Sequence, residues 1–236
     1  GIVDQATKSR IIGYIRTKTL VPQPIIEDPE YYYIGIAGNV FFNPSFTSNQ
    51  TNAIKSMVVS NLIALNDTVL ASFDTTVYQS LINDTIAKSE PSIIGNDVEL
   101  TLIRKLIPIF GVDQLYTFTL DNQIKSSVSG VYANTDAYGL ISNVFATIVD
   151  DEIVDAIIQD DGQGNIYLYK IVDGVKIKQP KAIGKVDYAT GSVSFKIDLY
   201  QTTPSFKIAS TLVSNSIDIS KNKFITVDGS DINLTM

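Results

Sequence analysis

The spacing of hydrophobic residues predicts two helices in the first half of the chain. From Thr47 to Leu65 hydrophobic residues recur every three or four positions, which places them on one face of a helix. Thr47-x-x-Gln50 has the form of a capping box and is expected to begin this helix. Asp74 is a good N-cap for a second helix, which Pro91 would end.

Strand-like runs lie on either side of these predicted helices. Tyr31–Phe41 and Val98–Ile107 are rich in β-branched and aromatic residues, and Ile11–Arg16 has the same character. The prolines of Val21–Pro24 and Glu27–Pro29 predict an extended connection between the first two runs. The expected order is strand, helix, helix and strand, with both helices covering one side of a small sheet.

From about Gly111 the pattern changes to short strands separated by turn residues. Asp173-Gly174 predicts a type I′ hairpin turn, and Ala189-Thr190-Gly191 predicts a three-residue hairpin loop with glycine in the left-handed position. Asp228-Gly229, between two further hydrophobic runs, predicts another hairpin. The second half therefore is expected to be antiparallel.

These elements together predict an α+β fold in two domains. The first, residues 1–110, would be the helix-covered sheet with an extended N-terminal arm. The second, residues 111–236, would be an antiparallel β-rich domain. The chain begins at Gly1 rather than Met, which suggests a processed product or a piece of a longer protein.

The composition excludes several kinds of chemistry. Cysteine, histidine and tryptophan are absent, so the chain has no disulfide, no thiol nucleophile, no imidazole base and no zinc or haem site of the usual ligand types. The net charge of −7 argues against general nucleic-acid binding. No hydrophobic run approaches the ~20 residues of a membrane helix. One basic cluster could be a solvated strand face or a docking arm for an acidic partner: Lys8, Arg10, Arg16 and Lys18.

The densest acidic stretch lies between residues 150 and 161. Two functional interpretations are a calcium site around Asp160–Asn165 and a pair of catalytic carboxylates. The favoured interpretation is a solvated turn with charges along an edge strand. The acidic residues concerned are Asp150, Asp151, Glu152, Asp155, Asp160 and Asp161.

Two further patterns lie within the strand predicted over residues 31–41. Gly35 and Gly38 lack the spacing of a phosphate-binding loop, so close backbone packing or a bulge is their expected role. Tyr31, Tyr32 and Tyr33 put aromatic rings on both faces of the strand. They indicate either a strand that is buried on one side and packed under a loop on the other, or an interface for a protein partner.

The order of elements and one hairpin carry a family resemblance. A strand over Tyr31–Phe42 precedes helices over Pro44–Leu65 and Phe73–Lys88, and a strand over Pro91–Gly111 ends in Gly-Val. The hairpin Ile183–Val193 has the pattern I-G-x-V-D-Y-x-T-G-x-V. Over about residues 31–200 the chain resembles the C-terminal part of a baseplate wedge protein from a contractile-tailed, T-even-like phage, in the baseplate J-like family.

The resemblance implies a structural role without catalysis and without a cofactor. Members of this family pair as dimers, close into a ring around the tail hub and hold other wedge subunits. The expected partners are further copies of the chain and other baseplate wedge and hub-proximal proteins, with no nucleic acid and no membrane. The expected location is the virion tail baseplate, and the host cytoplasm during assembly.

The residues alone leave two other functions open. The β-rich second half, the tyrosines and the Asp/Asn-rich turns suit a binding module such as an adhesin or a carbohydrate-recognition domain. A carboxylate-based hydrolase would need two carboxyl groups about 5–10 Å apart in one cleft.

Overall fold

A computed structural model describes residues 4–18, 26, 29–126, 139–201, 205–219 and 223–236. The chain divides into two units, residues 1–30 and residues 31–236. The connection over Val21–Pro24 and Glu27–Asp28 lies outside the described residues.

The first unit contains a helix, α1 (Gln5–Arg16), where a strand was expected over Ile11–Arg16. Asp4 caps α1, because its Oδ1 accepts from the backbone N of Thr7 at 2.9 Å. The strand prediction for Ile11–Arg16 is therefore wrong. The hydrophobic residues of this segment resemble those of a strand, but Asp4 caps a helix that continues through them. Three residues of the basic cluster lie on α1, and Lys18 follows it.

The second unit is mixed α/β, and the described residues are about 21% helix and 50% strand. Its helical elements are η1 (Pro44–Phe46), α2 (Thr51–Ala64), η2 (Leu65–Asp67) and α3 (Gln79–Ser89). Its strands are β1 (Glu30–Phe42), β2 (Val77–Tyr78), β3 (Ile93–Leu106), β4 (Gln114–Thr119), β5 (Leu140–Ser142), β6 (Phe145–Val149), β7 (Glu152–Asp160), β8 (Asn165–Val172), β9 (Val175–Asp187), β10 (Ser192–Ile197), β11 (Phe206–Thr211), β12 (Ser216–Ile217) and β13 (Lys223–Thr235).

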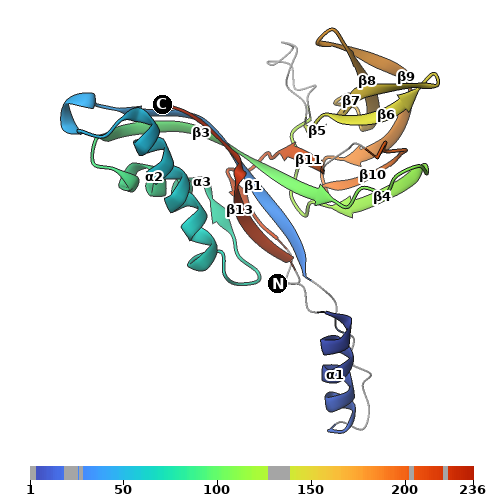
Figure 1. The fold of residues 1–236 in the computed structure, drawn as a ribbon, viewed down its shortest axis with the longest axis horizontal. Helices are drawn as coiled ribbons and strands as arrows, with labels where there is room; N and C mark the ends of the chain where they lie inside the picture. The colour runs from blue at the N-terminus through green and yellow to red at the C-terminus, as the bar shows by residue number, and fades with distance from the viewer. Residues whose placement is uncertain (1–3, 19–25, 27–28, 127–138, 202–204, 220–222) are drawn as a thin grey trace. The chain divides into compact units, whose positions relative to one another are not determined.

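A single large sheet joins the two halves of the chain (Figure 1). Its order is β13-β1-β3-β11-β5-β7-β8-β9-β10-β4, and β6 also pairs with β7. β3 pairs antiparallel with β1 on one side, as in Ile36↔Leu100, and with β11 on the other, as in Ile208↔Arg104. The boundary expected near residue 110 falls between β3 and β4, and the hydrogen bonds of the sheet cross it.

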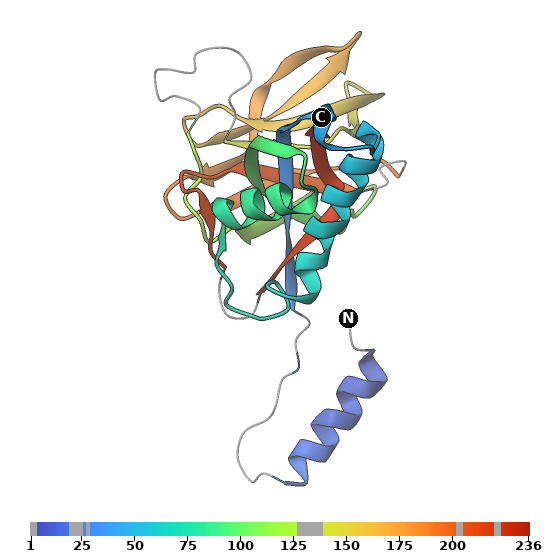
Figure 2. The same cartoon turned by 90° about the vertical axis from the view of Figure 1, so that its left-hand side faces the viewer.

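α2 and α3 pack against each other, and they contact β13 and β3 respectively (Figure 2). The hydrophobic faces expected of both helices are buried in large part, whereas Met57 and Tyr78, expected on these faces, are exposed. Their fully buried members are Ile54, Val58, Leu62, Ile82 and Ile86. Among the described residues, no helix is long and hydrophobic enough to span a membrane.

Both helices begin later than their predicted caps. Thr47 accepts a hydrogen bond from the backbone N of Asn49 rather than closing a capping box, and α2 starts at Thr51 with no side-chain cap. Asp74 has a φ of 59°, and Val77–Tyr78 then form a strand with β12 before α3 begins. At Thr47 a short turn satisfies the polar side chain and delays the helix. Before α3, the strand pairing of Val77–Tyr78 with β12 delays the helix.

The hairpin predictions have different outcomes. Asp173 and Gly174 have φ values of 51° and 78°, so the type I′ turn is confirmed. Gly191 has the expected positive φ of 70°, but its loop is four residues long because Asp187 pairs with Ser192. The hairpin at Asp228-Gly229 is wrong, because β13 continues through both residues.

The β-rich half has an aromatic core. The Phe206 ring lies 5.1 Å from that of Phe145 and 5.9 Å from that of Phe195, and all three residues are buried. In β1 the expected close packing of the glycines is confirmed. A Cβ on Gly38, whose φ is 149°, would collide with the carbonyl oxygen of Asp97 on β3.

Candidate functional site

The three consecutive tyrosines of β1 alternate between the core and the surface. Tyr32 has no exposed area, whereas Tyr31 and Tyr33 are half-buried. Tyr31 stacks on Phe224 with ring centroids 5.8 Å apart, and the Nζ of Lys105 lies 3.6 Å from the centre of the Tyr33 ring. Of the predicted interface residues, Tyr32 is therefore inside the protein, and only Tyr31 and Tyr33 are partly exposed.

Tyr32 links β1 to the end of β4. Its hydroxyl donates to the carbonyl oxygen of Thr119 at 2.5 Å, and the Nζ of Lys223 lies 5.0 Å from its ring centre. The same Nζ donates to Asp121 Oδ2 at 2.6 Å. Burial lowers the pKa of Lys223, but the hydrogen bond to Asp121 and the interactions with the charge of Asp121 and with Tyr32 together outweigh this effect and raise it. The cluster joins residues from before and after position 110.

The acidic stretch divides between a turn and the core. Asp150 and Asp151 are exposed, have positive φ values of 53° and 64°, and connect β6 to β7, which confirms the predicted turn. The predicted edge strand is wrong, because β7 pairs with β8 and also with β5 and β6. Asp160 also differs from the prediction of a solvated residue, because it is only 2% exposed. Its carboxylate accepts from Leu140 N at 2.9 Å, from Gly162 N at 3.1 Å and from the Tyr188 hydroxyl at 2.6 Å.

These contacts bear on the two functional interpretations of the acidic stretch. Both oxygens of Asp160 are occupied by protein donors, and the part of the chain that the structure describes has no group of three acidic residues placed to hold a metal ion. Glu152 and Asp160 lie at opposite ends of β7, about 25 Å apart at ~3.3 Å per residue. That separation exceeds the ~5–10 Å of a catalytic carboxylate pair.

The connection from β3 to β4 and the first two residues of β4, together residues 107–115, expose five large hydrophobic side chains. Tyr116 Oη accepts from Ile109 N at 3.1 Å, and Gly111 N donates to Leu199 O at 3.3 Å, so this segment is tied to the sheet. We call it the 107–115 segment. Its exposed hydrophobic residues, with exposed fractions of 40–84%, are Ile107, Ile109, Phe110, Val112 and Leu115.

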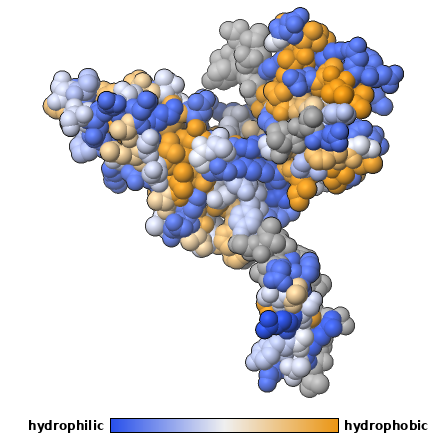
Figure 3. Space-filling model, in the orientation of Figure 1, coloured by the Kyte–Doolittle hydropathy of each residue, from blue (hydrophilic) through white to orange (hydrophobic). Residues whose placement is uncertain are grey.

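A second exposed hydrophobic surface lies at the end of the β8–β9 hairpin. Val172 pairs with Val175, and Ile177 pairs with Lys170, so the three hydrophobic side chains share one face. All three are exposed. Figure 3 shows hydrophobic residues at the surface over this part of the sheet. The sequence predicted the hairpin. Strand alternation alone could not show that the hydrophobic face of the hairpin is exposed at its end.

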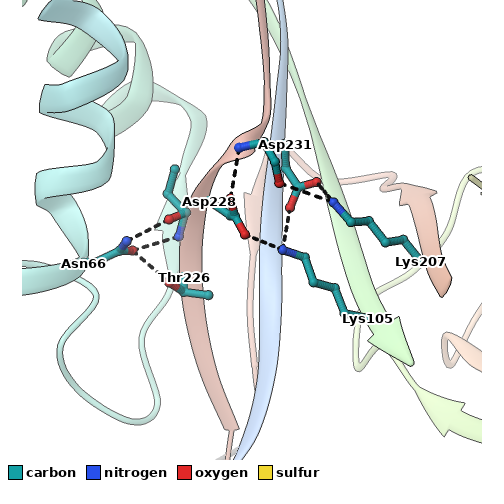
Figure 4. A network of polar contacts seen from close by, with 8 residues as sticks. Asn66, Lys105, Lys207, Thr226, Asp228 and Asp231 are labelled. Atoms are coloured by element: carbon teal, nitrogen blue, oxygen red, sulfur yellow. Dashed lines mark hydrogen bonds and ion pairs between the residues drawn. The ribbon is translucent and has the colours of Figure 1, made fainter. Parts of the chain in front are cut away.

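A polar network holds β13 in the sheet (Figure 4). Lys105 Nζ lies 2.5 Å from Asp228 Oδ2 and 3.1 Å from Asp231 Oδ2, and Lys207 Nζ lies 2.6 Å from Asp231 Oδ1. The hydrogen bond from Lys105 holds the pKa of Asp228 well below its ordinary value. Asn66, after α2, donates to Val227 O and accepts from Val227 N, each at 2.7 Å.

This network is structural rather than a binding site. Its lysines and aspartates neutralise one another, and the Asp231 side chain is only 5% exposed. It also explains why Asp228-Gly229 does not form a hairpin: the Asp228 carboxylate is held by Lys105 and by the backbone N of Ser230.

Comparison with known protein families and with curated proteins gives no match to this chain.

Proposed function

We propose that this chain is a structural subunit of a contractile phage tail baseplate, which forms dimers or a ring and holds other wedge proteins. The resemblance over residues 31–200 motivates the proposal. The observation that carries it is the 107–115 segment, where five large hydrophobic side chains are exposed on a backbone fixed by hydrogen bonds. Exposed hydrophobic surface of this kind is typical of protein–protein interfaces.

The finer architecture belongs to the same proposal. We propose that the chain has a helix-covered sheet before residue 110 and an antiparallel β-rich part after it. The two parts share β3 as a common strand, and an assembly subunit benefits from such a rigid connection between its interfaces. No catalytic residue and no cofactor are assigned.

The proposal is tested by measuring the mass of the protein in solution and imaging it by electron microscopy. A dimer or a ring is expected, with an interface of at least about 1,000 Å². Ile107→Asp and Phe110→Asp should weaken association, whereas Ile94→Asp, at a site that is 69% exposed on β3, is the matched control. A protein that stays monomeric at high concentration would contradict the proposal.

The same preparation tests the binding-module alternative. Neither a glycan panel nor calcium is expected to raise the melting temperature. A ligand that binds only the folded state raises it by mass action, so a clear shift would favour an adhesin or carbohydrate-recognition domain instead.

A further inference from the structure

The end of the β8–β9 hairpin is exposed on both of its faces. Every residue from Val172 to Lys178 is exposed, and neighbouring side chains in a strand point to opposite faces. In Figure 2 this hairpin extends beyond the neighbouring strands. A two-stranded ribbon alone is marginally stable in water, so an end that exposes its hydrophobic face is better stabilised by a partner. We call residues 172–178 the β8–β9 arm.

The two faces of the arm differ in chemistry. Val172, Val175 and Ile177 lie on one face, as their cross-strand pairing shows. Lys176 and Lys178 lie on the other, where Lys178 Nζ is 3.5 Å from the centre of the Tyr167 ring. The hydrophobic face is therefore available for packing, while the lysines set the charge of the arm.

The charge of the hairpin is opposite to that of the rest of the chain. Residues 165–187 contain five lysines and two aspartates, a net charge of +3, whereas the whole chain carries −7. The remainder therefore carries −10. This acidic remainder would repel an anionic membrane or a nucleic acid. It would attract the basic hairpin of a second copy, and such complementarity speeds association.

We propose that the β8–β9 arm of one copy packs its hydrophobic face on the 107–115 segment of a second copy. Each copy carries both surfaces, and the contact covers the exposed hydrophobic side chains of each. It is a head-to-tail contact, which closes into a ring or continues as a chain of subunits. The inference rests on the proposed function, because it names the surfaces of the self-association proposed above.

Cysteine cross-linking tests the contact directly, because the natural chain has no cysteine. The variants are Val175→Cys on the arm and Val112→Cys on the segment, with exposed fractions of 62% and 50%. Mixed and mildly oxidised, they should form a disulfide-linked dimer. Val175→Cys mixed with Val213→Cys, which is 55% exposed after β11, is the matched control.

The double variant Val175→Cys/Val112→Cys tests the head-to-tail geometry. It should give a ladder of cross-linked trimers, tetramers and larger species, whereas contact between two arms would stop at dimers. The charge argument is tested by Lys176→Glu/Lys178→Glu, which should slow association and reduce its salt dependence. Lys55→Glu/Lys88→Glu, on α2 and α3, makes the same change of charge elsewhere.

The outcomes separate this inference from the proposed function. If the cysteine-free protein associates but the arm–segment pair cross-links no more than the control, the inference is overturned and the proposed function stands. The arm would then belong to a different interface. If the cysteine-free protein is monomeric at high concentration, both are overturned. Arm–segment cross-links with a ladder support both.

Discussion

Single charged residues connect distant parts of this chain. Lys105 on β3 reaches two aspartates on β13, and Lys207 on β11 reaches one of the same two. Burial lowers the pKa of Lys105, but its hydrogen bonds to Asp228 and Asp231 and the negative charges of both aspartates together outweigh this effect and raise it. Removing one partner would leave a partly buried charge without its counter-ion. The resulting loss of folding free energy is larger than the net stabilisation that the ion pair provides.

Asp228→Asn is expected to lower the free energy of unfolding at pH 7 by about 1 kcal/mol, because the Asp228 side chain is 40% exposed and solvent screens its ion pair. The folded-state pKa of Asp228 is depressed from 3.8. Its contribution is therefore present above about pH 4 and is lost as the pH falls below that value.

Urea unfolding at pH 7, 5 and 3 checks this expectation. The difference between wild type and Asp228→Asn should shrink at pH 3. Asp84→Asn is the control, because Asp84 and its partner Lys88 are largely exposed and their pair should contribute little. If wild type and Asp228→Asn differed in unfolding free energy by the same amount at pH 7 and pH 3, the stabilising role of the ionised Asp228 would be contradicted.

Asp160→Asn is expected to lower the free energy of unfolding by about 3 kcal/mol, which is more than Asp228→Asn. The reason is that Asp160 is buried and its carboxylate accepts from three donors. An asparagine offers one acceptor oxygen and places an N–H₂ group against a donor. Asp161→Asn, at the neighbouring and less buried residue, should cost well under half as much. Thermal and urea unfolding of both variants at pH 7 give the comparison. Equal losses of unfolding free energy in the two variants would contradict a special role for the buried hydrogen bonds of Asp160.

At the scale of elements, the pairing of β1 with β3 depends on one glycine. Gly38→Ala is expected to destabilise the protein by about 2–4 kcal/mol, because its φ of 149° is unfavourable for alanine and its Cβ would meet the Asp97 backbone. Gly95→Ala on β3 is the matched control, since nothing lies within 4 Å of its Cβ. Chemical denaturation measures both, and a mild effect at Gly38 would contradict the close packing.

Element predictions succeeded where local chemistry and tertiary pairing agree. Asp173-Gly174 forms its turn because the flanking strands pair directly. Asp228-Gly229 has the same two residue types, yet Lys105 and Ser230 hold the aspartate, and β13 lies beside β1 as one strand. The outcome at this dipeptide depends in part on Lys105 and on β1, which lie more than 100 positions away and are absent from any local pattern.

At the scale of the whole molecule, the exposed surfaces were the least predictable feature. Tyr31–Tyr33 were identifiable as an aromatic cluster, but the burial of Tyr32 depends on Thr119 and Lys223. The 107–115 segment is visibly hydrophobic in the sequence, where it resembles the continuation of a buried strand. Its exposure follows from the end of the sheet pairing at Leu106↔Phe206.

The shared sheet predicts how the described part of residues 31–236 unfolds. Leu62 is buried between α2 and the sheet, and Phe206 is buried in the aromatic core of the β-rich half. Each change to alanine should cost about 3–5 kcal/mol. Because β3 pairs with strands of both halves and Tyr32 bonds to the end of β4, both variants should shift one common transition.

In the same urea titration, circular dichroism at a helix-sensitive wavelength follows the helices, which lie before residue 110 in the described part of the chain. Tyrosine fluorescence follows both halves, because tyrosines lie before and after residue 110. Coincident curves are expected for wild type, Leu62→Ala and Phe206→Ala. The exposed Met57→Ala on α2 is the control and should shift neither curve appreciably. If Phe206→Ala shifted the fluorescence curve but left the helix signal of wild type unchanged, the halves would unfold independently. The boundary near residue 110 would then separate two domains, because the pairing across β3 would be too weak to couple them.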